Sequence, residues 1–235
     1  MTDPHILSAY DEELKELRSV VSRMGGMAID QLLAAMQALR EVSVEEAEVV
    51  LKNDLILDKL ELKAEKTAIG VFARRAPVAD DLREVVSSIK MTTMIERMGD
   101  YAKNISRRTL DIAECSPVVM PQTLDNMADV AHRMIEDIMD SYVHRNADIA
   151  MDVWERGETL DNMHNAAYRQ ILARMMEVPD HINAYTHYLM IAKNLERIGD
   201  QATSIAEQIY YAITGEILED IRPTEDEQPA AKAGL

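Results

Sequence analysis

The stretch that decides the fold is Glu96-Arg97-Met98-Gly99-Asp100, because the chain repeats it 100 positions later as Glu196-Arg197-Ile198-Gly199-Asp200. The apolar residues upstream repeat with it, since Leu82, Val85 and Ile89 correspond to Ile182, Tyr185 and Leu189. A repeat of this period is a whole domain duplicated, longer than the units of most solenoid proteins. The sequence therefore predicts two similar halves.

In both halves the repeat places two acids at the end of an apolar helical face. Steps of three and four residues lead along this face to Glu96 and Asp100, and in the second half to Glu196 and Asp200. Such a face is buried against neighbouring helices, but like charges four residues apart disfavour a helix by about 0.2–0.5 kcal/mol. An unpaired carboxylate is also costly to bury. A positive partner is therefore expected for each pair.

That partner is either a basic side chain, with Arg97 and Arg197 as the nearest candidates, or a metal ion. Two matching copies favour the metal. The repeated glycines, Gly99 and Gly199, are a second indication, because a glycine inside a helix costs about 1 kcal/mol relative to alanine. Close packing of helices is the commoner cause of such glycines, and close packing would also let facing helices share ligands.

Further candidate ligands follow the same pattern of oxygen donors. Asn104 continues the first acidic face by one turn, whereas Ser204 stands at this place in the second half. Asp54 and Asp58, with Glu61, share one face of the preceding helix, where a solvated acidic face is an equally open interpretation.

The corresponding helix of the second half contains Asp161, with Glu158 and His164 on nearby turns. The spacing of Asp161 and His164 matches one half of a di-iron carboxylate motif. A second such motif is missing, so His164 is expected to be an ordinary histidine. Carboxylate and amide oxygens favour magnesium, manganese, calcium or iron, and the scarcity of Cys and His near the repeats argues against structural zinc.

Apolar residues recur at steps of three and four throughout the chain, which is typical of amphipathic helices. The pattern predicts helices over residues 14–39, 43–72, 77–112, 124–139, 146–171 and 180–214, with a linker over 113–121. The expected fold class is all-α, with two tandem pseudo-repeated three-helix bundles. Their bounds are residues 1–113 and 118–215, and the polar, proline-containing segment 216–235 is predicted to be a disordered tail.

Local signals mark several helix ends. Ser43 and Asn146 are predicted to be N-caps, and Asp180 has the same role at the last helix. Pro77 suits a first helical turn. Gly215 is a plausible C-terminal stop.

Composition narrows the possible functions. The net charge of −17 disfavours nucleic acid, whose phosphates would be repelled. Cys115 is the single cysteine, so no intrachain disulfide forms and a reducing compartment is favoured. The sequence shows neither a signal-peptide pattern nor an apolar stretch that would span a membrane. A cytoplasmic protein is predicted, with any membrane association through partners.

Catalytic signatures are missing from the sequence. It contains no phosphate-binding glycine loop, no nucleophile elbow and no Cys/His pair of recognisable spacing. No enzyme activity is therefore predicted.

The sequence resembles the PhoU family, the accessory proteins of the bacterial phosphate-specific transport system. The resemblance rests first on the duplicated Glu-Arg-x-Gly-Asp motif. It extends to Val21-Ser22-Arg23-Met24-Gly25-Gly26-Met27, Arg75-Ala76-Pro77-Val78-Ala79-Asp80-Asp81-Leu82-Arg83, Met175-Met176-Glu177 and Ile209-Tyr210-Tyr211. Together these segments cover the chain from about Tyr10 to Gly215.

The resemblance implies two tandem three-helix bundles that bind multinuclear metal clusters, with iron, manganese or magnesium as the expected ions. It also implies repression of the phosphate-starvation response, by linking the transporter ATPase, PstB, to the membrane histidine kinase, PhoR. A homodimer located at the inner membrane through these partners is expected. By position, the implied metal ligands are Glu96, Asp100, Asn104, Glu196, Asp200, Asp54 and Asp58, with Asp161 as a helper.

The second half departs from the family pattern. Where an aspartate is expected four residues before Asp161, this chain has Gly157. The second cluster would then have fewer ligands, use Glu158 instead, or be absent. Two alternatives remain, namely a carboxylate-bridged metal enzyme of helical-bundle type, and a purely structural helical adaptor whose acids pair with Arg97 and Arg197.

Overall fold

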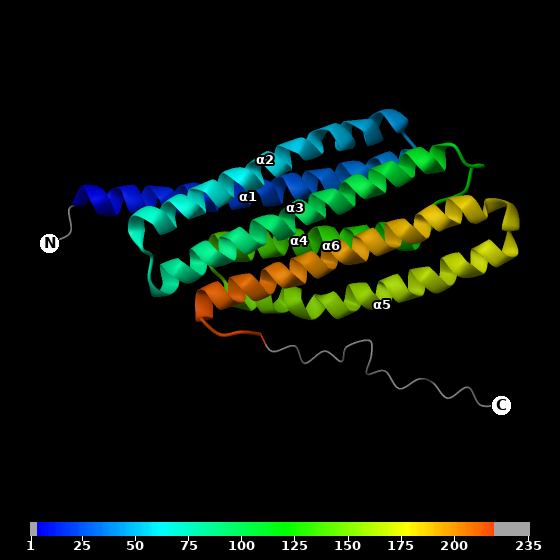
Figure 1. The fold of residues 1–235 in the computed structure, drawn as a ribbon. Helices are drawn as coiled ribbons and strands as arrows, with labels where there is room; N and C mark the ends of the chain where they lie inside the picture. The colour runs from blue at the N-terminus through cyan, green and yellow to red at the C-terminus, as the bar shows by residue number, and fades with distance from the viewer. Residues whose placement is uncertain (1–3, 219–235) are drawn as a thin grey trace, which may run out of the picture.

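The computed structural model describes residues 4–218, except for the side chains of residues 4–9, 54 and 75. These residues form six α-helices and one short 3-10 turn, with no strand among them (Figure 1). The elements are α1 (Pro4–Glu41), α2 (Val44–Arg75), α3 (Ala79–Ala113), α4 (Gln122–His144), α5 (Ala147–Glu177), η1 (Pro179–His181) and α6 (Ile182–Thr214). The predicted all-α class is confirmed. Residues 219–235 of the predicted tail lie outside the described residues.

The six helices form two three-helix bundles that lie side by side along their length (Figure 1). Helices α1, α2 and α3 contact one another, as do α4, α5 and α6, and the most extensive contact between the bundles joins α3 to α6. Helix α2 contacts only its own bundle, and so does α5. The duplicated helices α3 and α6 are therefore the inner pair, with α2 and α5 on opposite outer sides. This is the pseudo-repeated arrangement that the sequence predicts.

Three of the predicted helix caps are confirmed. The Ser43 hydroxyl accepts a hydrogen bond from the backbone N–H of the third residue after it at 3.3 Å. The Asn146 side chain accepts from the first turn of α5 at 3.0 and 3.3 Å. Gly215 follows α6 with a φ of 79°, the left-handed conformation in which a glycine ends a helix at low cost.

Two predicted helix starts are wrong. Helix α3 begins at Ala79, not at Pro77. Ala76 and Ala79, on either side of Pro77, both have positive φ angles (46° and 47°), so the chain turns at Pro77 and the helix starts after it. At the second junction Asp180 lies within the 3-10 turn, and His181 is the N-cap of α6.

The apolar faces of all six helices join in one core across both bundles. Methionines such as Met24, Met91 and Met98 are almost completely buried there, in keeping with their use as adaptable core side chains. Among the residues that the structure describes, no helix combines the length and apolar character needed to cross a bilayer.

Candidate metal sites

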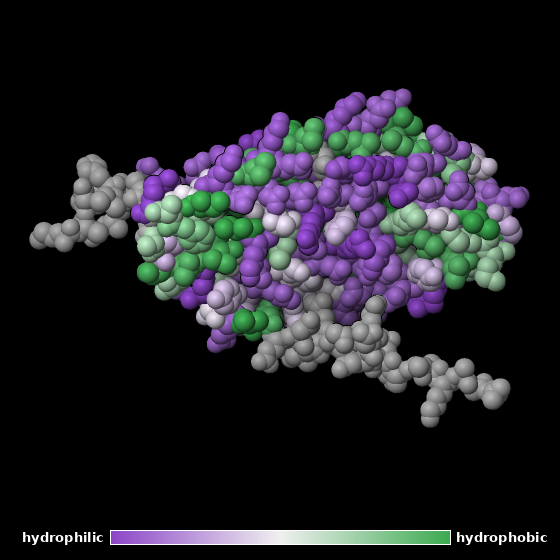
Figure 2. Space-filling model, viewed as in Figure 1, coloured by the Kyte–Doolittle hydropathy of each residue, from purple (hydrophilic) through white to green (hydrophobic). Residues whose placement is uncertain are grey.

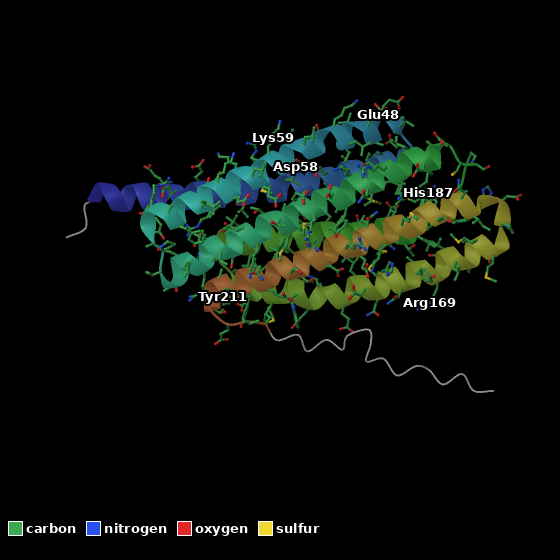
Figure 3. All side chains as sticks on the ribbon, in the orientation of Figure 1. Glu48, Asp58, Lys59, Arg169, His187 and Tyr211 are labelled. Atoms are coloured by element: carbon green, nitrogen blue, oxygen red, sulfur yellow. The ribbon has the colours of Figure 1, made fainter. Side chains whose placement is uncertain are left out.

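The first acidic pair flanks Gly99, a point of close contact between α3 and α2. A Cβ atom on Gly99 would collide with a methyl group of Leu57 on α2 and would stand 2.7 Å from the Gln31 side-chain oxygen on α1. Asp58 directly follows Leu57, and Asp100 directly follows Gly99. The glycine therefore brings α2 and α3 together at the level of these two acids, and Figure 3 labels Asp58 on the outer helix.

The second half repeats this arrangement. A Cβ atom on Gly199 would collide with a methyl group of Leu160 on α5. Asp161 follows Leu160, just as Asp200 follows Gly199. Close helix packing is thus the direct role of both repeated glycines.

Each acidic pair passes from the core toward solvent. The Glu196 side chain is only 12% exposed, whereas Asp200 is exposed. In the first half Glu96 is partly buried, and the Asp100 side chain is 45% exposed. In the second half the glutamate is therefore the enclosed acid and the aspartate the exposed one.

Two of these acids, Asp100 and Glu196, each have a lysine of the same helix, one turn away, beside them. Lys103 donates to Asp100 Oδ1 at 2.9 Å. The Lys193 ammonium forms an ion pair with Glu196 Oε2, an oxygen that is closed off from solvent. Arg197, one of the two arginines considered as alternatives to a metal, lies over the Tyr101 ring at 5.8 Å, a cation–π contact.

His164 lies next to Glu196, a contact that the sequence analysis did not predict. Its Nδ1 atom is 3.8 Å from Glu196 Oε1, and the side chain is only 17% exposed. The spacing of Asp161 and His164 on α5 was the signal for this position. An imidazole therefore accompanies the carboxylates in the second half, where the first half has oxygen donors.

The remaining candidate ligands differ in what the structure shows of their side chains. Asn104 is on the correct face of α3, but its side-chain oxygen accepts a hydrogen bond from Arg107 at 3.1 Å. Asp54 is on α2, and its side chain lies outside the described residues. On α5, Glu158 is exposed, and Gly157 is buried where the first half has Asp54.

The donor chemistry fits a hard or borderline cation, although the side chains are not gathered around one point. Within the described residues, no group of three or more His, Cys, Asp or Glu side chains is arranged to hold a metal ion. Oxygen donors from two facing helices suit magnesium, manganese or iron. A bound ion would have to displace Lys103 and Lys193 from the carboxylates.

A family model described as the PhoU domain matches the chain twice, at residues 21–109 and 124–209. The chain belongs to the PhoU family. The two matches include the first and second acidic pairs, respectively, so each three-helix bundle contains one PhoU domain.

Two PhoU homologs resemble the chain over nearly its whole length. The phosphate-specific transport system accessory protein PhoU homolog of Rhizobium meliloti is 39% identical over 227 residues, which are 96% of each chain. The homolog of the same name from Caulobacter vibrioides is 40% identical over 223 residues, covering 94% of this chain and 97% of the relative.

Solved PhoU structures share the fold. The crystal structure of PhoU from Pseudomonas aeruginosa superposes with a TM-score of 0.84 at 29% identity, covering 88% of this chain and 100% of that one. The phosphate transport system regulatory protein PhoU from Streptococcus pneumoniae gives a TM-score of 0.83 at 27% identity, with coverage of 89% and 99%.

Proposed function

We propose that this protein is a negative regulator of phosphate uptake and of the phosphate-starvation response. The observation that carries the proposal is the match to relatives named as accessory proteins of the phosphate-specific transport system, which for one of them covers 96% of each chain. A match of this extent leaves no large domain of the relative without a counterpart here.

The proposed mode of action is contact between proteins. In this proposal the protein links the transporter ATPase, PstB, to the sensor histidine kinase, PhoR, in the cytoplasm and at the inner membrane through these partners. It acts as a homodimer and catalyses no reaction. Two side-by-side bundles with separate outer helices, α2 and α5, suit an adaptor, because each presents its own surface to a partner.

We further propose that each bundle binds metal ions at its acidic pair. Glu96, Asp100 and Asn104 on α3, with Asp54 and Asp58 on α2, would hold the ion in the first bundle. In the second, the proposed ligands are Glu196, Asp200 and Asp161, with His164 added by the structure. A bound cation would neutralise the clustered carboxylates and draw each outer helix toward its inner helix. Iron, manganese and magnesium fit these donors.

The regulatory role is tested in a strain that lacks the gene. The strain should express phosphate-uptake genes and accumulate phosphate even in phosphate-rich medium, and the full chain supplied from a plasmid should restore repression. Normal repression in the deletion strain, with no paralogue present, would overturn the proposal.

The metal proposal is tested by elemental analysis of the purified protein. Glu96→Asn combined with Asp100→Ala should lower bound metal while circular dichroism shows unchanged helicity. Asp11→Asn combined with Glu12→Ala is a matched control, because it removes two exposed acids from α1. Unchanged metal in the first variant would exclude these ligands and favour the purely structural adaptor. Oxygen consumption by the loaded protein would instead favour a metal enzyme.

A further inference from the structure

A groove runs along the outer side of the first bundle, between α1 and α2. It has a volume of about 510 Å³ and lies between residues 27–37 of α1 and residues 46–56 of α2. Its walls are largely apolar, and the side chains include Met27, Ala34, Val49, Val50 and Ile56. Val49 is 54% exposed and Ile56 is 42% exposed. Figure 2 shows apolar surface among hydrophilic side chains along the edge where α2 runs.

The charge in this groove is negative and uncompensated. Among the side chains that the structure describes, Asp30 and Glu46 are the charged ones that line it, and no Lys, Arg or His does so. Neither acid has an ion-pair partner within the part of the chain that the structure describes. Farther along the same two helices, in contrast, Lys63 pairs with Glu16 at 2.9 Å, and Arg74 pairs with an α1 glutamate at 3.0 Å. The groove is therefore the part of this surface that attracts a cationic partner.

A buried amide adds a polar feature to the apolar wall. Gln31 lines the groove and is only 5% exposed. Both its side-chain oxygen and its side-chain nitrogen are closed off from solvent without a hydrogen-bond partner in the described residues. Buried polar groups in folded proteins are almost always paired, so this enclosed amide, whose oxygen lies against the Gly99 position of α3, is a local cost to stability at the base of the groove.

We propose that this groove binds an amphipathic helix of a partner protein whose polar face carries lysine or arginine. The inference rests on the proposed adaptor role and names the chemistry of one partner segment. Residues 27–37 of α1 span about 15 Å, the length of three helical turns. Apolar side chains of the partner at positions i, i+3 or i+4, and i+7 would enter the groove. Its basic side chains would then lie over Asp30 and Glu46.

Other occupants fit this groove less well. An anionic membrane surface would be repelled by the two acids, since such surfaces attract basic segments. A second copy of the chain carries the same net charge of −17, which opposes its approach to an acidic groove. Charge complementarity therefore favours a basic segment of another protein.

The direct test measures peptide binding to the full-length protein by fluorescence anisotropy. The probes are 20-residue peptides that tile the cytoplasmic parts of the transporter ATPase and the sensor kinase. A designed 18-residue helix of leucine and lysine, and a version interrupted by two prolines, are added. The designed helix should bind, and so should at least one of the 20-residue peptides that is amphipathic and basic. The proline version should bind at least tenfold more weakly, because it cannot form the helix.

Two matched variants locate the binding surface. Ile56→Lys should raise the Kd of these peptides at least tenfold, whereas Ile69→Lys should change it less than twofold. Both isoleucines are exposed on α2, both changes add one positive charge, and only Ile56 lines the groove. Circular dichroism and Tm confirm that both variants fold. Equal effects of the two variants would overturn the proposal.

Two other results would show that the groove binds a membrane or a second copy of the chain. Binding to phosphatidylglycerol vesicles that Ile56→Lys abolishes, without peptide binding, would assign the groove to the membrane. A concentration-dependent dimer that the same variant dissociates would assign it to a second copy. Either result overturns the helix proposal. The regulatory function is judged separately by the deletion strain, whose derepression does not depend on the groove.

Discussion

Replacing Glu84 should destabilise the contact between the two bundles more than any exposed charge substitution. Glu84 lies on α3, and its side chain is only 7% exposed. It accepts a bidentate pair of hydrogen bonds from Arg18 on α1, of which the Nη2 bond measures 2.7 Å. It also accepts from Arg145 Nη1, at the end of α4, at 2.7 Å. One buried carboxylate thus joins three helices and both bundles. The hydrogen bond with Glu84 also raises the pKa of Arg18.

The magnitude follows from burial and geometry. A hydrogen bond to a charged group contributes about 1.5–3 kcal/mol to the free energy of unfolding. Because the Arg18 and Arg145 side chains are 45% and 43% exposed, solvent screening reduces this contribution. We expect Glu84→Gln, which keeps the shape and removes the charge, to cost about 2 kcal/mol. For a chain of this length, that corresponds to a fall in Tm of roughly 4–8 °C.

The assay is thermal unfolding of Glu84→Gln, Arg145→Gln and the double variant. A double-mutant cycle should give a coupling energy of about 1 kcal/mol, since the two residues are in direct contact. Asp80→Asn is the matched control. Its partner Arg83 lies on the same helix at 2.6 Å, and the Asp80 side chain is 74% exposed, so about 0.5 kcal/mol or less is expected. A coupling energy of zero, or equal losses for Glu84→Gln and Asp80→Asn, would refute the reasoning.

Further predictions concern helix packing and pH. Gly26→Ala should stabilise the protein by about 0.5–1 kcal/mol, because nothing lies within 4 Å of the added Cβ. Gly199→Ala should destabilise it by about 1–3 kcal/mol through overpacking against Leu160, and urea unfolding of both variants measures the difference. Burial raises the pKa of Tyr142 to about 12, so the folded state keeps a proton that the unfolded state releases near pH 10. Stability should therefore be complete below about pH 10 and fall between about pH 10 and 12, and Tyr142→Phe should reduce this fall in Tm measurements.

The helices and their duplication were predictable because they depend on local patterns. Apolar spacing of three and four residues is enough to predict a helix, and the repeat around Gly99 and Gly199 reveals the duplication. The predicted caps at Ser43 and Asn146 depend on side-chain contacts within three residues. The start of α3 was mispredicted at Pro77, because the preceding backbone turns through positive φ angles at positions where the sequence has alanine.

The contacts that build the sites are long-range, and no local pattern marks them. Glu84 meets Arg18 and Arg145 across 66 and 61 positions of the chain. His164 meets Glu196 only because α5 and α6 pack in one particular alignment. Lys193 and Lys103, which lie next to the acids, could have been inferred from their spacing of three residues on the same helix, because such side chains are neighbours.

The first bundle places its candidate metal site and the α1–α2 groove on two sides of the same helix. Leu57 of α2 packs against Gly99, which directly precedes Asp100 of the acidic pair. Gln31 lies against the same glycine and also lines the groove. A shift of α2 toward α3 on cation binding would therefore change the width of the groove. Thermodynamic linkage then requires that a helix in the groove and a cation at the acids alter each other's affinity by the same factor. The proposed cation site and the proposed helix-binding groove would then be coupled through α2.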